Sequence, residues 1–221
     1  MSEIKINKNS TQRERMDAGL LYFSEDPSVI TEQFKRMEML YDYNKTRPRQ
    51  AKKRAKLLQK MFESIGEDAY IEPPLHANWT GKFVKIGKHF YSNYNLTLVD
   101  DGPIEIGDDC MFAPNVVVAT AGHPINAYLR TFGAQYNAPV KIGDRVWLGA
   151  GVVVLPGVTI GNNCVIGAGS VVTKDIPDNS IAFGNPCTVR RQVSERDDIY
   201  FFKDMKIDWE NLPIPENEKK D

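Results

Sequence analysis

The sequence has little cysteine and little histidine. Its 221 residues include three of each, and no two cysteines have CxxC spacing. We therefore expect neither a disulfide framework nor a cysteine zinc site, and we expect a reduced, cytoplasmic protein. Cys110 and Cys164 fall on inward positions of the repeat described below, where a thiol behaves as a small hydrophobic group.

Long apolar runs and a charge imbalance are missing as well. No stretch of about 20 apolar residues could span a membrane, and the first residues, MSEIKINKNSTQRER, lack the apolar core of a signal peptide. The 28 basic and 29 acidic residues nearly cancel. We therefore expect neither a membrane nor a nucleic acid as partner.

The densest apolar region repeats every six residues. Aliphatic residues lead each hexad, glycine directly follows four of the six leads, and a small or apolar residue comes four places after each lead. The leads are Ile142, Leu148, Val154, Ile160, Ile166 and Val172, and the second set is Val146, Val152, Val158, Cys164, Ser170 and Ile176. The region is too rich in glycine for a helix and too long for one strand of about 3–10 residues. It is a hexapeptide repeat.

The same rhythm is present further upstream, in the series Ile86, Ser92, Leu98 and Ile106, Phe112, Val118. Such a period builds short strands joined by tight corners, where glycine or asparagine adopts left-handed dihedral angles. Three hexads close one coil, and coils stack at the spacing of parallel strands, roughly 4.8 Å. We predict a mainly β fold, a parallel β-helix built from hexapeptide repeats.

Three zones divide the chain. We predict a helical N-terminal segment over residues 1–66, a β-helix over 67–182 with a loop extruded at 121–139, and a C-terminal segment and tail over 183–221. Within the first zone, Asp26-Pro27 suits the start of a helix, and Arg47-Pro48 interrupts the helical pattern. Gly66 is well placed to end a second helix.

The second helix carries the basic run RPRQAKKRAK, and no acidic residue occurs from Lys45 to Lys60. Three interpretations are open: nucleic-acid binding, attraction of an anionic small molecule, and a solvated helix face. We favour the solvated face, because acidic residues elsewhere balance the charge.

A repeat alone indicates a scaffold, so function has to come from what interrupts it. The extruded loop begins TAGHP, and it places His123 between glycine and proline where the regular strand gives way to a long insertion. Working groups concentrate in such segments. Upstream, YSNYNLTLVDD places Asn93, Asn95, Asp100 and Asp101 one or two coils earlier. We expect these polar residues to face His123 across a cleft.

Several long motifs, in order, resemble the galactoside and maltose O-acetyltransferases of the hexapeptide acyltransferase superfamily. They are YSNYNLTLVDD, APNVVVATAGHP, PVKIGDRVWLGAGVVVLPGVTIG and VIGAGSVVTKDIP…AFGNPC, with DAGLLY and IEPPLH in the helical N-terminus. The likeness runs from about residue 11 to residue 191. It implies a homotrimer of left-handed β-helices with active sites between subunits. It also implies transfer of acetyl from acetyl-CoA to a hydroxyl of a sugar or glycoside, without a metal.

The resemblance also assigns roles to single residues. His123 matches the general base, and Asn93 matches an active-site asparagine. Acceptor-contacting positions are matched by Asn78 and Asp101, with Asp26 near a third such position. On the coenzyme side, the matching residues are Ala150, Ala168, Thr173, Lys174 and Arg191, with Trp147 near the thioester end.

This sequence departs from the family pattern in three places. The family has an acidic residue just after its AGxLY motif, where Phe23 and Ser24 stand here and Glu25 and Asp26 follow. Thr188 replaces a CoA-contacting arginine. The HANWTGKFVKIG segment around Asn78 is one residue longer than is usual in the family.

Transfer from a thioester to an alcohol needs a base for the hydroxyl and a donor for the oxyanion. We expect His123 to take the hydroxyl proton and to return it to the CoA thiolate, a role worth roughly 10²–10⁴-fold in rate. We expect the backbone N–H of Ala150 to stabilise the oxyanion, and Asn93 to assist or to position the acceptor. No cysteine stands in a setting typical of a nucleophile, so we expect direct transfer. Lys174, Arg190 and Arg191 suit the phosphates of CoA.

Other hexapeptide proteins fit less well. Antibiotic-modifying acetyltransferases of the superfamily usually lack the helical N-terminus, and they remain the alternative for a non-sugar hydroxyl. A γ-type carbonic anhydrase needs three zinc histidines at a fixed spacing that His76, His89 and His123 do not supply. A purely structural or ice-binding coil would show a regular Thr-x-Thr face and no extruded loop.

Overall fold

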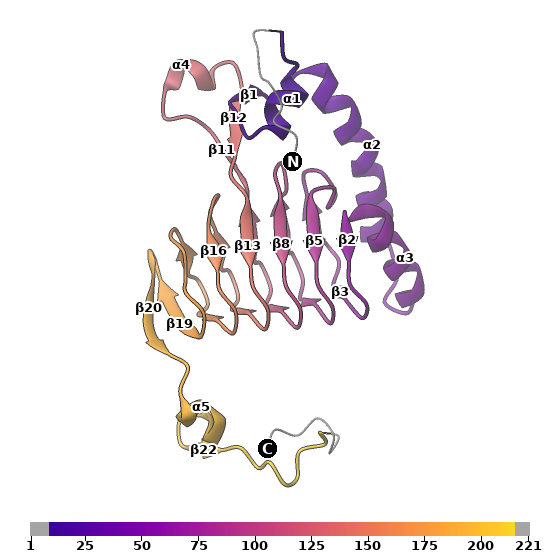
Figure 1. Ribbon diagram of the computed structural model, residues 1–221. Helices are drawn as coiled ribbons and strands as arrows, with labels where there is room; N and C mark the ends of the chain where they lie inside the picture. The colour runs from indigo at the N-terminus through magenta and orange to yellow at the C-terminus, as the bar shows by residue number, and fades with distance from the viewer. Residues whose placement is uncertain (1–8, 215–221) are drawn as a thin grey trace.

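The computed structural model describes residues 9–214 and confirms the parallel β-helix (Figure 1). Short strands form three flat faces that the chain visits in turn, in about six turns. We call these faces 1, 2 and 3, and we call the turns between them edges. Among the described residues, no helix is long and apolar enough to cross a membrane.

The strands of each face lie parallel and in register, apart from one antiparallel pair at the end. Face 1 consists of β2 (Ser64–Ile65), β5 (Val84–Ile86), β8 (Ile104–Ile106), β13 (Val140–Ile142) and β16 (Thr159–Ile160). Face 2 consists of β3 (Tyr70–Ile71), β6 (Tyr91–Ser92), β9 (Met111–Phe112), β14 (Trp147–Leu148), β17 (Val165–Ile166), β19 (Ser180–Gly184) and β20 (Cys187–Gln192). Face 3 consists of β4 (His76–Ala77), β7 (Thr97–Val99), β10 (Val117–Ala119), β15 (Val153–Val154) and β18 (Val171–Val172).

The leading residues of the hexads fill the core, as the repeat predicted. Ile106, Ile142 and Ile160 stack on one another through face 1. The residues four places after the leads are buried too, including Val146, Val152 and both Cys110 and Cys164. Each coil therefore covers the apolar groups of its neighbours, and stability accumulates from one coil to the next.

The corners depend on small residues for two different reasons. Asn95, Asn115 and Gly151 adopt positive φ angles of 62°, 63° and 69°, which asparagine and glycine accept most readily. Gly143 is required by close approach instead, because a Cβ there would lie 2.6 Å from Oδ1 and 2.8 Å from N of Asn162 in the next coil. The glycines after the leads thus allow the coils to stack.

Two helices, α2 (Pro27–Asn44) and α3 (Ala51–Met61), close the N-terminal end of the coil, at the right of Figure 1. The shorter helix α1 (Gln12–Asp17) and the strand β1 (Tyr22–Phe23) precede them and lie above the coil. As predicted, α2 begins at Pro27, and the Asp26 side chain accepts the N–H of Ser28 at 2.9 Å as the N-cap. Our prediction for the end of the second helix was wrong.

That helix, α3, ends at Met61, and Ser64–Ile65 already pairs with β5 of face 1. Gly66 is a corner glycine of the first coil, because a Cβ there would lie 2.5 Å from the backbone of Gly87. The β-helix therefore begins before residue 67.

The extruded segment has secondary structure of its own. It contains β11 (Ala121–Gly122), α4 (Ala127–Arg130) and β12 (Ala134–Asn137), and it rises above the coil at the upper left of Figure 1. Strand β12 pairs antiparallel with β11 on one side and with β1 on the other. The N-terminal segment and the loop thus share a three-stranded sheet.

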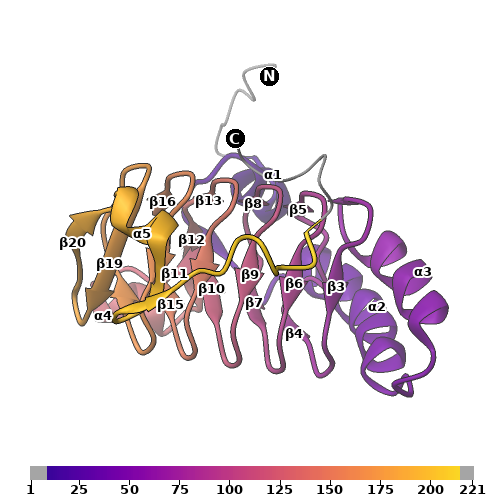
Figure 2. The same cartoon turned by 90° about the horizontal axis from the view of Figure 1, so that it is seen from below.

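After the last coil, β20 folds back antiparallel on β19. The chain then leaves the coil through α5 (Glu195–Ile199), β21 (Tyr200–Phe202) and β22 (Met205–Lys206). Figure 2 shows this last segment, in yellow, running back along the length of the coil.

Candidate active site

The side chains of Asn78 and Asp101, which the sequence predicts to contact the acceptor, are hydrogen-bonded to each other. Asn78 Nδ2 donates to Asp101 Oδ2 at 2.8 Å, and Trp79 Nε1 donates to Asp101 Oδ1 at 3.2 Å. Asn78 follows β4 and Asp101 follows β7, so stacking of adjacent coils brings them together at the edge from face 3 to face 1. Asp101 is only 7% exposed and both its oxygens are held, which fixes the carboxylate in one orientation.

The neighbouring Asp100 has a structural role. Its carboxylate is fully buried and accepts the backbone N–H groups of Trp79 at 2.8 Å and Gly81 at 2.7 Å. Burial raises the pKa of Asp100 to about 6, although these two N–H donors act in the opposite direction. Asp100 therefore shapes the turn that presents Asn78 and does not face a cleft.

His123 follows β11 at the start of the extruded loop, and its side chain is exposed. Its Nδ1 lies 2.7 Å from the carbonyl oxygen of Ala134 in β12. A carbonyl can only accept, so Nδ1 carries the proton and Nε2 of the neutral ring is left with a lone pair. The preceding Gly122 is packed under a ring, because a Cβ there would lie 2.8 Å from the ring of Tyr136.

Strand β12 links His123 to the acceptor residues. Asn137, at its far end, donates from Nδ2 to the backbone oxygen of Asp101 at 2.8 Å. Gln135 Nε2 donates to the Tyr22 hydroxyl at 2.6 Å, and that hydroxyl donates to Asn137 Oδ1 at 3.4 Å. Burial and the Asp101 carboxylate raise the pKa of Tyr22, so the phenol stays protonated as a donor.

A second group of predicted residues lies at another edge, between faces 2 and 3. Asn93 follows β6, Ala150 follows β14 and Ala168 follows β17. The turns stack directly, with Gly169 N donating to Ala150 O at 2.8 Å. Both alanines are exposed, and no hydrogen bond among residues 9–214 uses the N–H of Ala150. That N–H is therefore available to an external acceptor.

Unlike the backbone N–H of Ala150, the side chain of Asn93 is partly engaged within its own corner. Its Oδ1 accepts the N–H of Tyr94 at 2.8 Å within the corner. The side-chain amide nitrogen is thereby turned away from that contact, and it is the part of Asn93 that can donate to a ligand.

The remaining coenzyme candidates are spread along the coil. Trp147 projects outward from face 2 and is 52% exposed. Thr173 and Lys174 follow β18 at the edge from face 3 to face 1, and both are exposed. Arg191 lies in β20 and binds both oxygens of Asp197, with two distances of 2.6 Å. The guanidinium lowers the pKa of the Asp197 carboxyl.

Glu25 and Asp26 follow the position near the N-terminus where this sequence departs from the family pattern. Their side chains have different surroundings. Asp26 is occupied as the cap of α2, and the Ser28 side chain and N–H lower the pKa of its carboxyl. The Glu25 side chain instead lies close to Gly133, within 4 Å of a Cβ built there. Glu25 is thus beside β12, the strand that orients His123.

The cysteine thiols lack the properties of a catalytic nucleophile. Cys110 Sγ donates to Gly143 O at 3.1 Å, and Cys164 Sγ donates to Pro177 O at 3.2 Å. Burial raises the pKa of Cys110 to about 11. A buried protonated thiol is a poor nucleophile.

The other charged candidates show no convergent site. His89 Nδ1 lies 2.9 Å from Asp109 Oδ1 on an exposed corner, and this contact raises the pKa of His89. Within residues 9–214, no three side chains of His, Cys, Asp or Glu gather as a metal site.

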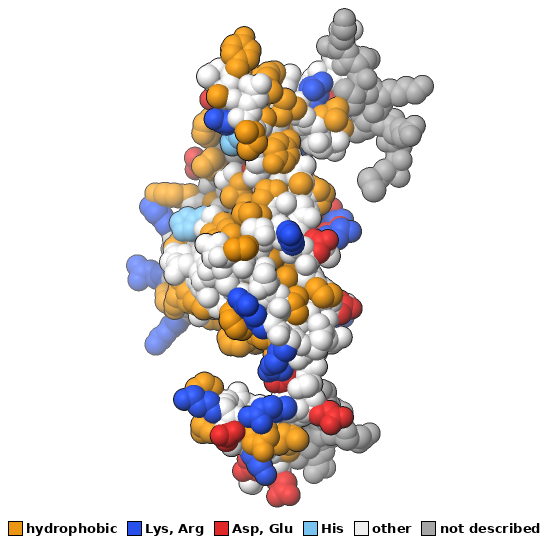
Figure 3. All heavy atoms as spheres, turned by 90° about the vertical axis from the view of Figure 1, so that its left-hand side faces the viewer, with side chains coloured by type: hydrophobic (Ala, Val, Ile, Leu, Met, Phe, Trp, Pro, Cys, Tyr) orange, Lys and Arg blue, Asp and Glu red, His pale blue; other side chains and the backbone are white. Residues whose placement is uncertain are grey.

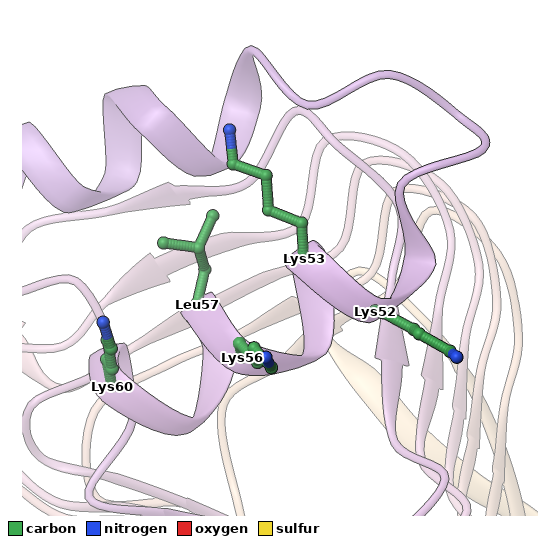
Figure 4. Close-up of a pocket in the computed structure, with 5 residues that line it drawn as sticks. All are labelled: Lys52, Lys53, Lys56, Leu57 and Lys60. Carbon is green, nitrogen blue, oxygen red and sulfur yellow. The ribbon is translucent and has the colours of Figure 1, made fainter.

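The basic helix α3 presents its lysines to solvent. Figure 4 shows Lys52, Lys53, Lys56 and Lys60 around Leu57, and their ammonium groups point in different directions. Arg54 is the exception, because it is buried and donates to Thr46 Oγ1 at 2.9 Å. Diverging side chains favour the solvated face over a site for an anion.

One protomer thus brings together only part of the predicted set. His123, Asn78 and Asp101 share one edge, whereas Asn93, Ala150 and Ala168 share the other. The sequence pattern did not reveal Trp79, Gln135 or Asn137, which hold the first group in place. They lie outside the hexad rhythm, and their role depends on contacts between segments far apart in the chain.

Two family profiles match this chain. One, described as the bacterial transferase hexapeptide with six repeats, matches residues 139–174. The other, the maltose acetyltransferase hexapeptide capping motif, matches residues 15–66. The first covers the part of the coil from β13 to β18, and the second covers most of the helical N-terminal segment.

Similar proteins match over nearly the whole chain. A galactoside O-acetyltransferase of Lactococcus lactis subsp. lactis (strain IL1403) is 50% identical over 198 residues, which cover 90% of this chain and 96% of the relative. A solved galactoside acetyltransferase in complex with coenzyme A is 44% identical with a TM-score of 0.87, covering 90% of this chain and 99% of that one. A hexapeptide-repeat acetyltransferase of Vibrio cholerae O1 biovar eltor, complexed with acetyl coenzyme A, is 28% identical with a TM-score of 0.76, covering 84% of this chain and 100% of the other.

Proposed function

Since the chain belongs to the galactoside and maltose O-acetyltransferase family of hexapeptide-repeat acyltransferases, we propose that it transfers acetyl from acetyl-CoA to a hydroxyl of a sugar or glycoside. The observation that carries this proposal is the geometry at one edge. An imidazole with a free ring nitrogen is held at the Ala134 end of β12, and the Asn137 end of the same strand holds Asp101, whose carboxylate is hydrogen-bonded to Asn78. Such a pair suits the hydroxyl groups of an acceptor.

In the proposed reaction, Nε2 of His123 accepts the proton of the acceptor hydroxyl as its oxygen attacks the thioester carbon. The tetrahedral intermediate then collapses, the C–S bond breaks, and the imidazolium returns the proton to the CoA thiolate. The carbonyl of Ala134 supports this cycle, because it holds Nδ1–H in both protonation states and keeps the ring from turning.

The oxyanion of the intermediate needs a donor that is already in place. The N–H of Ala150 is unused within the described part of the chain. Ala150 stands between Gly149 and Gly151, and the corner stacked on it in the next coil consists of Ala168 and Gly169. The loss of one such donor typically costs roughly 3–4 kcal/mol in the transition state. Asn93, at the same edge, can position the acceptor or assist this donor through its free amide nitrogen.

Direct transfer, without an acyl-enzyme, is supported by the state of the thiols. Cys110 and Cys164 are buried and donate to carbonyl groups, and burial raises the pKa of Cys187 as well. None of the three resembles the low-pKa, accessible cysteine that acts as a nucleophile.

The outward side chains of the three faces support a homotrimer. Face 1 turns polar groups outward, and Lys141 and Glu105 form an ion pair there at 3.5 Å. Faces 2 and 3 turn rows of apolar groups outward. The row on face 2 is Tyr70, Tyr91, Met111, Trp147, Val165 and Ile181. The row on face 3 is Val117, Val153 and Val171, and the polar residues Thr97 and His76 continue it toward the N-terminal end.

Large contiguous apolar patches usually mark contact surfaces. Two different apolar faces and one polar face suit a closed ring in which each copy contacts two neighbours. In such a ring, an edge of one copy can meet an edge of the next. The group around His123 and the group around Ala150, which one protomer keeps apart, could then form one site between subunits.

The test is release of free thiol from acetyl-CoA with a panel of acceptors. The panel holds galactosides, maltose, free monosaccharides and non-sugar alcohols, including chloramphenicol and a streptogramin. Sugar-dependent thiol release with an O-acetylated sugar detected by mass spectrometry is the expected result. Turnover only with the non-sugar compounds would replace the proposed acceptor class, and no transfer to any hydroxyl would contradict the proposal.

A further inference from the structure

The last described segment, Ser194–Ile214, is an apolar arm outside the coil. It follows β20, the final strand of the sheet that forms face 2. Its large apolar side chains are exposed to an unusual degree for so short a segment. They are Phe201 at 62%, Phe202 at 58%, Met205 at 55%, Ile199 at 47%, Trp209 at 42% and Leu212 at 38%.

The arm is held together by local contacts. Ile207 N donates to Ile199 O at 2.9 Å, and Trp209 Nε1 donates to Asp198 O at 3.0 Å. Strands β21 and β22 pair antiparallel through Tyr200 and Lys206. These contacts give the arm a defined shape while its aromatic side chains stay on the outside.

The root of the arm is fixed to the coil. Arg191 of β20 binds both carboxylate oxygens of Asp197, and Val193 N donates to Asn179 O at 2.8 Å. A bidentate pair restricts orientation as well as position. The arm therefore leaves the coil in a set direction.

That direction carries the arm along the coil but apart from it. Figure 1 shows the arm as a separate body below the strands, and Figure 2 shows it passing the positions of β15, β10, β9 and β6. Figure 3 shows hydrophobic side chains on its surface together with charged ones. Met111 and Trp147 of the outward row on face 2 are 55% and 52% exposed.

We propose that the arm of each protomer packs on the coil of a neighbouring copy in the homotrimer. The proposal rests on the homotrimer of the proposed function. Two apolar surfaces, the arm and the outward row of face 2, are both exposed in a single copy, and the arm follows directly on β20, the last strand of the face 2 sheet. A ring of copies places a neighbour against that row, and an arm that starts from the same sheet extends the contact.

The first test asks whether the arm contacts its own coil or another. A photo-crosslinking phenylalanine analogue replaces Phe201 in the full-length protein, which is co-expressed with a longer, affinity-tagged copy without the probe. Illumination is expected to give a crosslinked species with the mass of one probe chain plus one tagged chain. Crosslinks confined to the probe-bearing chain would overturn the proposal, as would a lack of any crosslink.

The second test measures assembly in the variant F201S/F202S/W209S, with K203S/K206S as a matched control in the same arm. Light scattering over a dilution series is expected to show dissociation of the first variant at a concentration at least tenfold higher than for the parent protein and the control. Unchanged assembly in F201S/F202S/W209S would overturn the arm contact while leaving the homotrimer intact. A parent protein that is monomeric at all concentrations would contradict the homotrimer itself. Acetyl transfer is measured in a separate assay, the release of thiol from acetyl-CoA, so failure of the arm contact can be distinguished from failure of the proposed function.

Discussion

The Nδ1 atom of His123 lies 2.7 Å from the carbonyl oxygen of Ala134. This one contact decides which ring nitrogen can act as a base, because the carbonyl requires a proton on Nδ1. It also ties the ring to β12, the strand whose other end binds the backbone of Asp101 through Asn137. His123 and the proposed acceptor residue Asp101 are therefore positioned by the same short strand.

Replacing His123 with Asn separates these two roles. The Asn amide can still donate to Ala134 O as Nδ1 does, but it has no basic nitrogen. We expect H123N to lower kcat by about 10²–10⁴-fold, the usual contribution of a general base. Affinity for CoA, measured by calorimetry, should stay within twofold. Steady-state thiol release gives kcat.

The matched control is H89N, because His89 is also an exposed histidine with one partner, Asp109. Turnover of H89N should equal that of the parent protein. If H123N kept full turnover, His123 would have no catalytic role.

Asp101 offers a change of charge with little change of shape. In D101N, Oδ1 can still accept from Trp79 Nε1, and the new amide can donate to Asn78 if the Asn78 amide turns over. Hydrogen bonds to a charged group contribute about 1.5–3 kcal/mol, so we expect kcat/KM for the sugar to fall roughly 10- to 100-fold. KM for acetyl-CoA should be unaffected.

An appropriate comparison for D101N is D109N, which removes an exposed carboxylate that is paired only with His89 in the described structure. Its kinetic constants should match the parent protein. A D101N variant with normal sugar kinetics would show that this carboxylate does not contact the acceptor.

A substitution at Ala150 tests the acetyl-CoA side of the proposed site. Its side chain is exposed at the corner between faces 2 and 3, so a larger residue needs no rearrangement of the core. We expect A150L to raise KM for acetyl-CoA at least tenfold, because the added atoms occupy the space that leads to the free N–H. A55L, on the exposed side of α3, adds the same atoms elsewhere and should leave KM unchanged. Equal KM values in both variants would place the thioester elsewhere.

The coil could be predicted from the sequence because hexad geometry is local and repeats. A lead such as Ile142 can pack only on the leads above and below it, so spacing alone determined which residues fill the core. The same spacing explains why the break after Thr120 had to leave the coil. The structure adds that this segment forms strands β11 and β12, which depends on pairing with the distant β1.

The candidate site could be predicted only in part from the spacing of the repeat. Asn78 and Asp101 meet because one coil separates them, which the repeat length does predict. The contact of His123 with Ala134 depends on how an irregular loop folds back, and no periodicity encodes that. The end of α3 was missed for a similar reason, since Gly66 looks like a helix terminator until the neighbouring coil shows that it is a corner.

The last prediction concerns stability and pH at Asp100. Burial raises the pKa of its carboxyl in the fold to about 6, above the ordinary value of 3.8. At a pH between 3.8 and about 6, the Asp100 carboxyl is protonated in the folded protein and ionised in the unfolded chain. Stability from this group is therefore present below pH 4 and is lost as the pH rises through 6. From the size of the difference, the loss is about 3 kcal/mol.

The measurement compares urea unfolding of the parent protein and D100N from pH 4 to pH 7.5. D100N loses one acceptor for the N–H groups of Trp79 and Gly81, so it should be less stable at pH 4. Because Asn does not titrate, D100N is the reference for this one group. The advantage of the parent protein should shrink as the pH rises toward 6 and then stay level, since above that pH the Asp100 carboxyl is ionised in both the folded and the unfolded state. An advantage that grows over the same interval would mean that the two N–H donors outweigh burial and that the carboxylate is favoured in the fold.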